Sequence, residues 1–246
     1  MLTEKRREII LQLLRKKGSI TVNEIKDELG ISESTIRRDL NALDEEGKLV
    51  KVFGGAVLNN YEFSSKEPTV SQKKDMNLEA KRSIAKYAAS LIEPEDFVYI
   101  DAGTTTGCMI DYIREKSATY VTNAVTHARN LAIAGFKVIL LGGKLKGSTE
   151  AVVGSSAVTA LKEYNFNKGF FGANGISIKC GITTPDISEA DVKRVALAHC
   201  NHKYILADST KFDNISSVTF ARLDCVKFLT DSKVSDIYKD YDIRIV

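Results

Sequence analysis

The stretch that decides the N-terminal fold is ISESTIRRDL, residues 31–40. Ser32 suits a helix N-cap, because its hydroxyl oxygen can accept a hydrogen bond from a backbone N–H of the first turn. Ile36 and Leu40 lie four residues apart, so in a helix they share one face and are expected to pack inward. We therefore predict a helix that starts after Ser32 and ends at Gly47, because a glycine commonly follows the last turn.

Two further helices are predicted before this one. Thr21 and Glu24 form a capping box, in which each side chain satisfies a backbone donor of the other residue. Gly30 follows that helix, where a left-handed residue is needed. Thr3 is expected to cap the first helix. Two short helices joined through residues 29–32 are typical of a helix-turn-helix.

The helix after Ser32 carries polar and basic side chains outward in its first turns, where a recognition helix meets base edges and phosphates. Arginine can bind guanine with two hydrogen bonds or clamp a phosphate, and serine and threonine are small donors for either role. Residues 48–57 contain two β-rich runs that turn at Gly54-Gly55, which predicts a hairpin wing with lysines toward the DNA backbone. The residues expected at the DNA are Ser32, Ser34, Thr35, Arg37, Arg38, Lys48, Lys51, Gly54 and Gly55.

Net charge alone does not identify this partner. The chain has 246 residues, with 35 Lys+Arg against 32 Asp+Glu and a formal net charge of +3. Residues 1–57 contain 11 Lys+Arg and 10 Asp+Glu, so this part is also near neutral in sum. DNA affinity depends on where the cations lie. A small helical core with solvated charges is the alternative, but the cap, the glycine turn, the arginine pair and the basic hairpin in this order favour DNA binding.

Composition excludes several classes of protein. No apolar run reaches the roughly 18–20 residues that a membrane helix needs, and the charged N-terminus does not resemble a secretory signal. The four cysteines form no CxxC pair, which predicts reduced thiols in a cytoplasmic protein. His199 and His202 have no second pair with ligand spacing, so we expect no metal and no cofactor.

A polar stretch divides the chain into domains. Residues 58–77 are polar and contain Pro68, which predicts a linker, free or packed on a neighbouring domain. We therefore expect a winged helix-turn-helix domain over residues 1–57 and an α/β domain over residues 78–246.

Residues 78–246 alternate helical stretches with short apolar runs. Repeated β-α-β units predict a mostly parallel, Rossmann-like sheet that is covered on both faces. The predicted strands are 97–100, 119–121, 138–141, 169–171, 204–207 and 226–229, and the predicted helices include 125–134, 157–164 and 188–198.

Polar residues follow five of these strands. Ligands bind beyond the carboxyl ends of parallel strands, so these residues predict a pocket for a small phosphorylated or polyhydroxylated ligand. After the first strand, the glycines, threonines and helix start of residues 101–107 suit a phosphate. The motifs of nucleotide sites are missing, because there is no GxGxxG and Ser148 stands where a P-loop needs lysine. The other polar strand ends are 122–123, 142–144, 172–175 and 208–212.

The motif TIRRDL of residues 35–40, with Gly54-Gly55-Ala56 after it, resembles the winged helix-turn-helix of the DeoR/GlpR-type bacterial transcription regulators. In that family the position of Phe53 is often histidine and that of Lys51 often arginine. The strand ends of the second half resemble the DeoR-type effector domain, which is similar to ribose-5-phosphate isomerase. The matching pieces are 101–105, 122–123, 142–143, 172–175 with Gly181, and 208–212.

The resemblance implies a repressor of a sugar uptake or catabolic operon. Such a protein binds double-stranded operator DNA as a homodimer or homotetramer, and a phosphorylated sugar relieves the repression. By this likeness the phosphate is held by Gly103, Thr104, Thr105 and Thr106. The sugar is contacted or oriented by Asp101, Asn123, Asn174, Glu189 and Lys211.

Two other classes of function stay open. A sugar-phosphate isomerase fused to a DNA-binding domain would need a carboxylate base such as Glu189. Against this, Asn174 stands where the related isomerases carry acidic residues, and an amide cannot accept a substrate proton, so we expect no enzyme activity. A constitutive DNA-binding or architectural protein is the third class, and its pocket would have no ligand.

Overall fold

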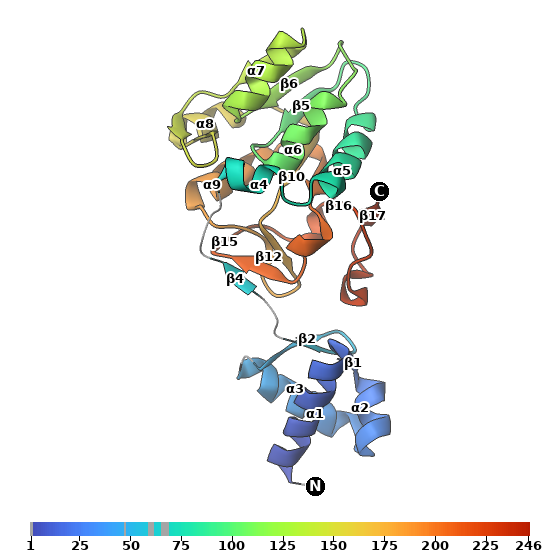
Figure 1. Cartoon of the computed structure of the whole chain (residues 1–246). Helices are drawn as coiled ribbons and strands as arrows, with labels where there is room; N and C mark the ends of the chain where they lie inside the picture. The colour runs from blue at the N-terminus through green and yellow to red at the C-terminus, as the bar shows by residue number, and fades with distance from the viewer. Residues whose placement is uncertain (1, 47, 59–61, 65–68) are drawn as a thin grey trace. The chain divides into compact units, whose positions relative to one another are not determined.

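The structure is a computed structural model that describes residues 2–46, 48–58, 62–64 and 69–246. Contacts within the chain divide it into two units, Met1–Tyr61 and Glu62–Val246 (Figure 1). The predicted helix end at Gly47 and the predicted Pro68 of the linker fall outside the described residues.

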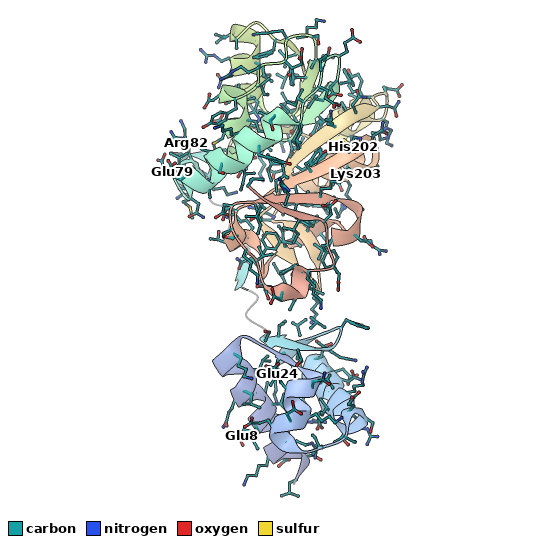
Figure 2. All side chains as sticks on the ribbon, turned by 90° about the vertical axis from the view of Figure 1, so that its right-hand side faces the viewer. Glu8, Glu24, Glu79, Arg82, His202 and Lys203 are labelled. Carbon is teal, nitrogen blue, oxygen red and sulfur yellow. The ribbon has the colours of Figure 1, made fainter. Side chains whose placement is uncertain are left out.

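Local caps define the helices of the first unit. Thr21 accepts a hydrogen bond from the Glu24 N–H, and the Glu24 carboxylate accepts one from the Thr21 N–H at 2.8 Å, so the predicted capping box is confirmed. Figure 2 labels Glu24 in the first unit. Gly30 is left-handed, with φ 62° and ψ 32°. The predicted cap at Thr3 is wrong, because Thr3 is already the first helical residue and Leu2 precedes it. The elements are α1 (Thr3–Lys17), β1 (Ser19–Thr21), α2 (Val22–Leu29), α3 (Glu33–Glu45), β2 (Leu49–Val52) and β3 (Gly55–Leu58).

The three helices of this unit share one core with a small antiparallel sheet, whose strand order is β1-β3-β2. The hairpin turns at Phe53-Gly54, one residue earlier than predicted. Gly55 already belongs to β3 and pairs with Thr21 of β1. A Cβ at Gly55 would lie 2.2 Å from the Ile20 carbonyl oxygen. The second glycine is therefore needed for the close approach of two strands and not for the turn.

The second unit contains a seven-stranded sheet in which every neighbouring pair is parallel. This confirms the predicted α/β fold. The three-residue strand at the end of the chain was not predicted. In spatial order the strands are β17 (Ile243–Ile245), β16 (Lys227–Thr230), β13 (Cys200–Leu206), β10 (Phe166–Gly172), β5 (Phe97–Ile100), β6 (Thr119–Thr122) and β7 (Lys137–Leu140).

Helices cover both faces of this sheet, and each strand supplies both cores because its side chains alternate. On β5, Val98 and Ile100 pack with α5, whereas Tyr99 faces the core that contains α8 and α9. The helices are α5 (Leu78–Ser90), α6 (Thr104–Cys108), α7 (Val125–Ile133), α8 (Ser155–Leu161) and α9 (Ile187–Ala198), with short 3-10 turns η1 (Met109–Asp111), η2 (Ser209–Lys211), η3 (Leu223–Cys225) and η4 (Asp236–Tyr238).

Smaller elements surround the carboxyl edge of the sheet. The segment predicted as a linker contains β4 (Glu62–Ser64), which pairs in parallel with β14 (Asn214–Ser216), and α4 (Val70–Lys74). Thr69 and Gln72 form the capping box of α4. The remaining strands are β8 (Lys144–Lys146), β9 (Ala151–Val153), β11 (Gly175–Ser177), β12 (Gly181–Thr184) and β15 (Val218–Ala221).

Candidate DNA-binding surface and effector pocket

The start of α3 presents hydroxyls and guanidinium groups to solvent. Ser32 caps the helix as predicted, and its Oγ lies 3.0 Å from the Ser34 hydroxyl and 2.9 Å from that of Thr35. The Arg37 side chain is 62% exposed and lies 3.8 Å from the Glu33 carboxylate. Arg38 is also exposed. An exposed ion pair of this kind contributes little, about 0–1 kcal/mol, so Arg37 can exchange Glu33 for a phosphate at low cost.

The wing places two of its lysines beside α3. Lys48 pairs with Glu46 at 2.7 Å and stays more than half exposed. The Lys51 ammonium donates to Asn41 Oδ1, and its backbone N–H donates to Asp44 at 3.2 Å. Gly54 lies at the exposed turn with φ 83°. Gly55, by contrast, is buried against β1, and that contact explains the glycine without any DNA.

An ion pair between the buried Asp39 of the TIRRDL motif and arginines of α1 is a feature that the sequence did not predict. Asp39 is 2% exposed, and its carboxylate pairs with the guanidinium of Arg6 and lies 3.4 Å from that of Arg7. Both arginines come from α1, so Asp39 fastens the first helix to the third. An acidic residue followed by leucine in a helix carries no signal of burial, which is why only the structure reveals this role.

The second unit has a pocket of about 320 Å³ at the carboxyl edge of its sheet. The residues after β5, β10 and β13 line it, as expected for a parallel sheet. Of the nine residues predicted to bind the effector, the pocket brings together Gly103, Thr104, Thr105, Asn174, Glu189 and Lys211.

The other three predicted residues lie behind the pocket lining. Thr106 is fully buried, and its hydroxyl donates to the Asp101 carbonyl at 2.7 Å. Asn123 Oδ1 accepts from the Tyr99 hydroxyl at 3.1 Å and from the Ala102 N–H at 2.9 Å. These side chains fix the ends of β5 and β6, so their hydrogen bonds support the pocket from behind its lining.

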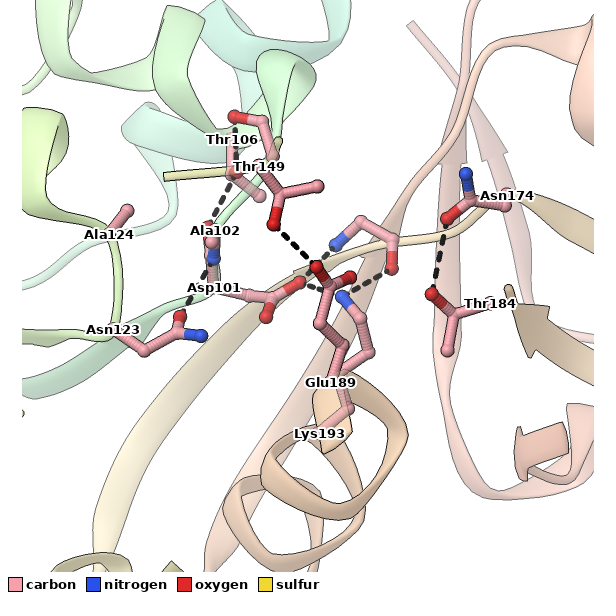
Figure 3. A network of polar contacts seen from close by, with 12 residues as sticks. Asp101, Ala102, Thr106, Asn123, Ala124, Thr149, Asn174, Thr184, Glu189 and Lys193 are labelled. Carbon is pink, nitrogen blue, oxygen red and sulfur yellow. Dashed lines mark hydrogen bonds and ion pairs between the residues drawn. The ribbon is translucent and has the colours of Figure 1, made fainter. Parts of the chain in front are cut away.

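Asp101 belongs to a buried ion pair with Lys193 of α9 (Figure 3). Lys193 also donates to the Gly172 carbonyl at 3.1 Å, and the Gly172 N–H donates to Asp101 at 3.1 Å. Burial raises the pKa of the Asp101 carboxyl, and the Lys193 ammonium opposes that rise. The pair therefore joins β5, β10 and α9 beneath the pocket.

Glu189 lines the pocket from the first turn of α9 and is already hydrogen-bonded. Its Oε1 accepts from the Thr149 hydroxyl at 2.6 Å (Figure 3). The same oxygen accepts from Lys146 at 3.2 Å. On the opposite side, Asn174 Oδ1 accepts from the Thr184 hydroxyl at 3.3 Å, which leaves its amide N–H groups for another acceptor.

Asp208 lines the pocket and belongs to the predicted polar strand end 208–212, although it was not among the residues predicted to bind the effector. It is 1% exposed, and its Oδ1 accepts from Asn77 Nδ2 at 3.1 Å and from the Thr210 N–H at 3.2 Å. Its Oδ2 is buried and has no partner among the described residues. Asp208 stands in a strand-end motif, but only the structure shows that Oδ1 is hydrogen-bonded within the protein and that, among the described residues, Oδ2 is not.

Lysines outnumber carboxylates in this pocket. Lys73, Lys81, Lys193 and Lys211 line it, against Glu189 and Asp208. Lys81 is 4% exposed, and its ammonium donates to the Lys73 carbonyl. Burial lowers the pKa of Lys81, while the nearby Asp208 raises it and Lys211 lowers it further. Lys81 and Lys73 come from α5 and α4, where sequence reasoning expected no site.

Family comparison supports both halves of the chain. Residues 6–62 match the DeoR-like helix-turn-helix domain, and residues 76–232 match the DeoR C terminal sensor domain. The chain belongs to the DeoR family. This DeoR-family protein is therefore a DNA-binding transcription regulator with a separate sensor domain.

Curated proteins similar to this DeoR-family chain carry regulator names. An uncharacterized HTH-type transcriptional regulator FruR of Bacillus subtilis is 38% identical over 100% of this chain and 98% of its own length. A lactose phosphotransferase system repressor of Staphylococcus epidermidis is 38% identical over 87% of this chain and 86% of its own. Among solved structures, ribose 5-phosphate isomerase A of Methanocaldococcus jannaschii has a TM-score of 0.41 at 15% identity, covering 55% of each chain.

Neither metal nor membrane features occur in the part of this DeoR-family chain that the structure describes. Its residues contain no group of three or more His, Cys, Asp or Glu side chains that could hold a metal ion. None of the described helices is long and apolar enough to span a membrane.

Proposed function

We propose that this DeoR-family protein represses a sugar uptake or catabolic operon, and that a phosphorylated sugar in its pocket releases it from the operator. The observation that carries the proposal is Asp208 Oδ2, a buried carboxylate oxygen without a described partner, in a pocket that four lysines line. A carboxylate accepts hydrogen bonds from hydroxyls, and ammonium groups bind phosphate. The pocket thus offers both kinds of group that a sugar phosphate needs. The relative named as a lactose phosphotransferase system repressor supports the same class of function.

Lys81 and Lys211 are the cations that we assign to the phosphate. Lys193 is already paired with Asp101, whereas Lys81 donates only to a carbonyl among its described contacts. Because burial lowers the pKa of Lys81, its charged form is destabilised, and a bound dianion would stabilise it. The same pocket is also lined by Gly103, which leaves its backbone open to a ligand, and by the hydroxyl-bearing Thr104 and Thr105.

Asp208 and Asn174 are the groups that we assign to the sugar hydroxyls. Asp208 Oδ2 can accept from a hydroxyl, and the Asn174 amide can donate to one. Glu189 faces the ligand but keeps its bonds to Thr149 and Lys146. Asp101, Asn123 and Thr106 act as positioning residues, since their polar atoms are engaged behind the lining.

The same pocket touches the segment that leads to the DNA-binding unit, which supplies a route for release. Val70 and Lys73 of α4 line the pocket, and the Val70 N–H donates to the Ser148 carbonyl at 3.1 Å. The pocket residues Asn214, Ile215 and Ser216 form β14, to which β4 is hydrogen-bonded. A ligand that rearranges α4 or β14 thus acts on residues 62–77. A coupling of about 1–3 kcal/mol between effector and operator is typical of such a switch.

Operator recognition is assigned to α3 and the wing. Ser34, Thr35, Arg37 and Arg38 would meet base edges and phosphates, and Lys48 and Lys51 the adjacent backbone. Ser32 acts as the helix cap and Gly54 as the wing turn. A homodimer or homotetramer in the cytoplasm would place paired helices on repeated half-sites.

A sensor fits the pocket better than an enzyme. The isomerase alternative takes Glu189 as its carboxylate base, and Glu189 already accepts two hydrogen bonds. A sensor needs only a ligand that binds two conformations with different affinity.

The test is an operator-binding assay with added effectors. A duplex that the wild-type protein selects from a random-sequence pool serves as operator, and pentose and hexose phosphates are added, with the unphosphorylated sugars as controls. At least one phosphate should release the duplex and raise the melting temperature of the second unit. Isomer conversion of any added sugar phosphate would instead support the enzyme.

Matched variants assign the pocket residues. Lys211→Ala, Lys81→Ala and Asp208→Asn should keep operator binding and lose the response to the sugar phosphate. Lys86→Ala is the control, because Lys86 is exposed on the same helix as Lys81. A normal response in all three pocket variants would show that the effector binds elsewhere.

A further inference from the structure

The tip of the wing carries an exposed aromatic side chain. Phe53 has a relative exposure of 105%, so its ring touches almost nothing in the protein. Every other aromatic side chain whose burial the structure describes is buried or half-buried. A phenyl ring in water is unfavourable, because its apolar area is fully hydrated. Its position therefore leaves the whole ring available to a partner.

The ring is held on a firm support. Val52 pairs with Gly55 directly below the turn, and β3 lies between β1 and β2 in the sheet. The Gly54 carbonyl accepts a hydrogen bond from the Val22 N–H at 2.8 Å, which fastens the turn to the start of α2. The backbone that carries the ring is therefore preorganised, and binding would order only the side-chain torsions of Phe53.

The surroundings of the ring indicate the chemistry of the partner. Lys51 lies two residues before Phe53 and is exposed, and it contacts Asn41 of the recognition helix α3. The large exposed apolar side chains of the described first unit are only Leu2 and Phe53, at opposite ends of its sequence. A protein interface would need a contiguous apolar patch here, whereas a single ring on a hairpin that also carries the exposed Lys48 and Lys51 suits a polyanion with apolar surface between its charges.

We propose that Phe53 enters the minor groove of operator DNA beside the half-site read by α3, and packs there on deoxyribose and base edges. The inference rests on the proposed DNA-binding surface and adds a contact that is not electrostatic. Apolar side chains of this kind act as wedges in minor grooves and bend the duplex. Such a contact releases no counterion, so its contribution does not fall with salt as that of Lys51 does. The two kinds of contact can therefore be separated by measurement.

The first experiment measures duplex affinity against salt concentration. The full chain, wild type or variant, is titrated onto the duplex that the wild type selects from a random-sequence pool. Phe53→Ala should bind about tenfold more weakly at every salt concentration, with an unchanged salt slope. Lys51→Ala should lower the slope of log K against log salt by about 0.9. Phe53→Leu should retain much of the affinity, because it keeps an apolar side chain.

The second experiment locates the contact by hydroxyl-radical footprinting, which reads the deoxyribose hydrogens of the minor groove. Phe53→Ala should lose protection in the minor groove beside the half-site and keep it elsewhere. Wild-type affinity and footprint in Phe53→Ala, with binding lost in Arg38→Ala, would overturn the inference and leave the DNA-binding surface intact. Unchanged binding in Arg38→Ala would instead remove the surface itself. Dissociation of the protein assembly by Phe53→Ala in sedimentation would assign the ring to a second copy and also overturn it.

Discussion

The two units of this protein use their polar side chains in opposite ways. In the first unit the groups assigned to DNA are exposed and weakly paired, and the buried pair of Arg6 and Asp39 serves the fold. In the second unit the polar groups that support the pocket, such as Asp101 and Lys193, are buried and bonded to one another, whereas Asp208 Oδ2 is left without a described partner. Binding and folding are therefore separable in the first unit and closely linked in the second.

Asp39→Ala is the strongest test of this contrast. It removes the carboxylate that pairs with Arg6, whose side chain is 12% exposed. Removing one partner of a buried ion pair costs about 3–5 kcal/mol, so the first unit should unfold or become marginal. Hydrogen exchange of the full chain should show lost protection over residues 3–58 and unchanged protection in the seven-stranded sheet.

Arg38→Ala is the matched control for that variant, since it changes the same motif at an exposed position. It should lose operator binding with native protection. Equal protection in both variants would mean that Asp39 does not fasten α1 to α3.

The pKa of His127 shows how strongly burial disfavours a charged side chain in the second unit. This residue lies on α7 against Gly107 of α6, and burial lowers its pKa to about 4 from the usual 6.5. The unfolded chain protonates this ring below its usual pKa and the folded chain does not. The stability it contributes is therefore present above pH 6.5 and is lost as the pH falls toward 4. The loss is about 3 kcal/mol.

Urea unfolding checks this pH dependence in the second unit alone, because every tyrosine except Tyr61 follows residue 77 and reports through near-UV circular dichroism. His127→Gln is the comparison. It should lose less stability than the wild type between about pH 7 and about pH 4.5. The same loss in both proteins would place the acid sensitivity in other groups.

The two neighbouring glycines of the wing are glycines for different reasons. Gly55 lacks space for a side chain, whereas Gly54 has a positive φ. Gly55→Ala should cost about 2 kcal/mol, because its Cβ would clash with a backbone oxygen of β1. Gly54→Ala has open space but a positive φ of 83°, and should cost about 1 kcal/mol. Exchange of the β1 amides should increase in the Gly55 variant. A larger effect at Gly54 would contradict this assignment.

The capping box of α2 predicts the smallest effect. Thr21→Ala should destabilise the helix by about 1 kcal/mol, read as faster exchange over residues 22–29. Hydrogen bonds from the Thr21 backbone N–H and from Lys17 hold the pKa of Glu24 at about 2, below its usual 4.5. The stability linked to Glu24 is present above pH 4.5 and is lost as the pH falls toward 2. Glu24→Gln should remove that dependence without altering the second unit.

Local signals in the sequence predicted much of the fold. Capping residues such as Thr21 and Ser32 act on their immediate neighbours, and the apolar runs of a parallel sheet are buried on both faces. Short strands were missed, because β1 and β17 each have three residues and owe their pairing to distant partners. The predicted hairpin turn lies one residue too late in the sequence. Gly55 is a glycine because its backbone approaches β1 closely, where it pairs with Thr21, thirty-four residues earlier in the chain.

The candidate site was predictable to a smaller degree. Parallel topology brings strand ends together, so Thr104, Asn174 and Lys211 could be expected on one rim. Which polar atom is already satisfied depends on packing, and the sequence carries no signal for the bonds of Asn123 or for the free oxygen of Asp208. Lys81 enters the pocket from a helix face, where a lysine usually is solvated.

The alternation of exposure along α3 also has a use in retargeting the protein to new operators. Within TIRRDL, Thr35, Arg37 and Arg38 reach the surface, whereas Ile36, Asp39 and Leu40 are buried. Designed libraries can therefore randomise positions 35, 37 and 38 and leave positions 36, 39 and 40 unchanged. The same six residues thus combine exposed positions that can be varied to change operator specificity with buried positions that keep the helix folded.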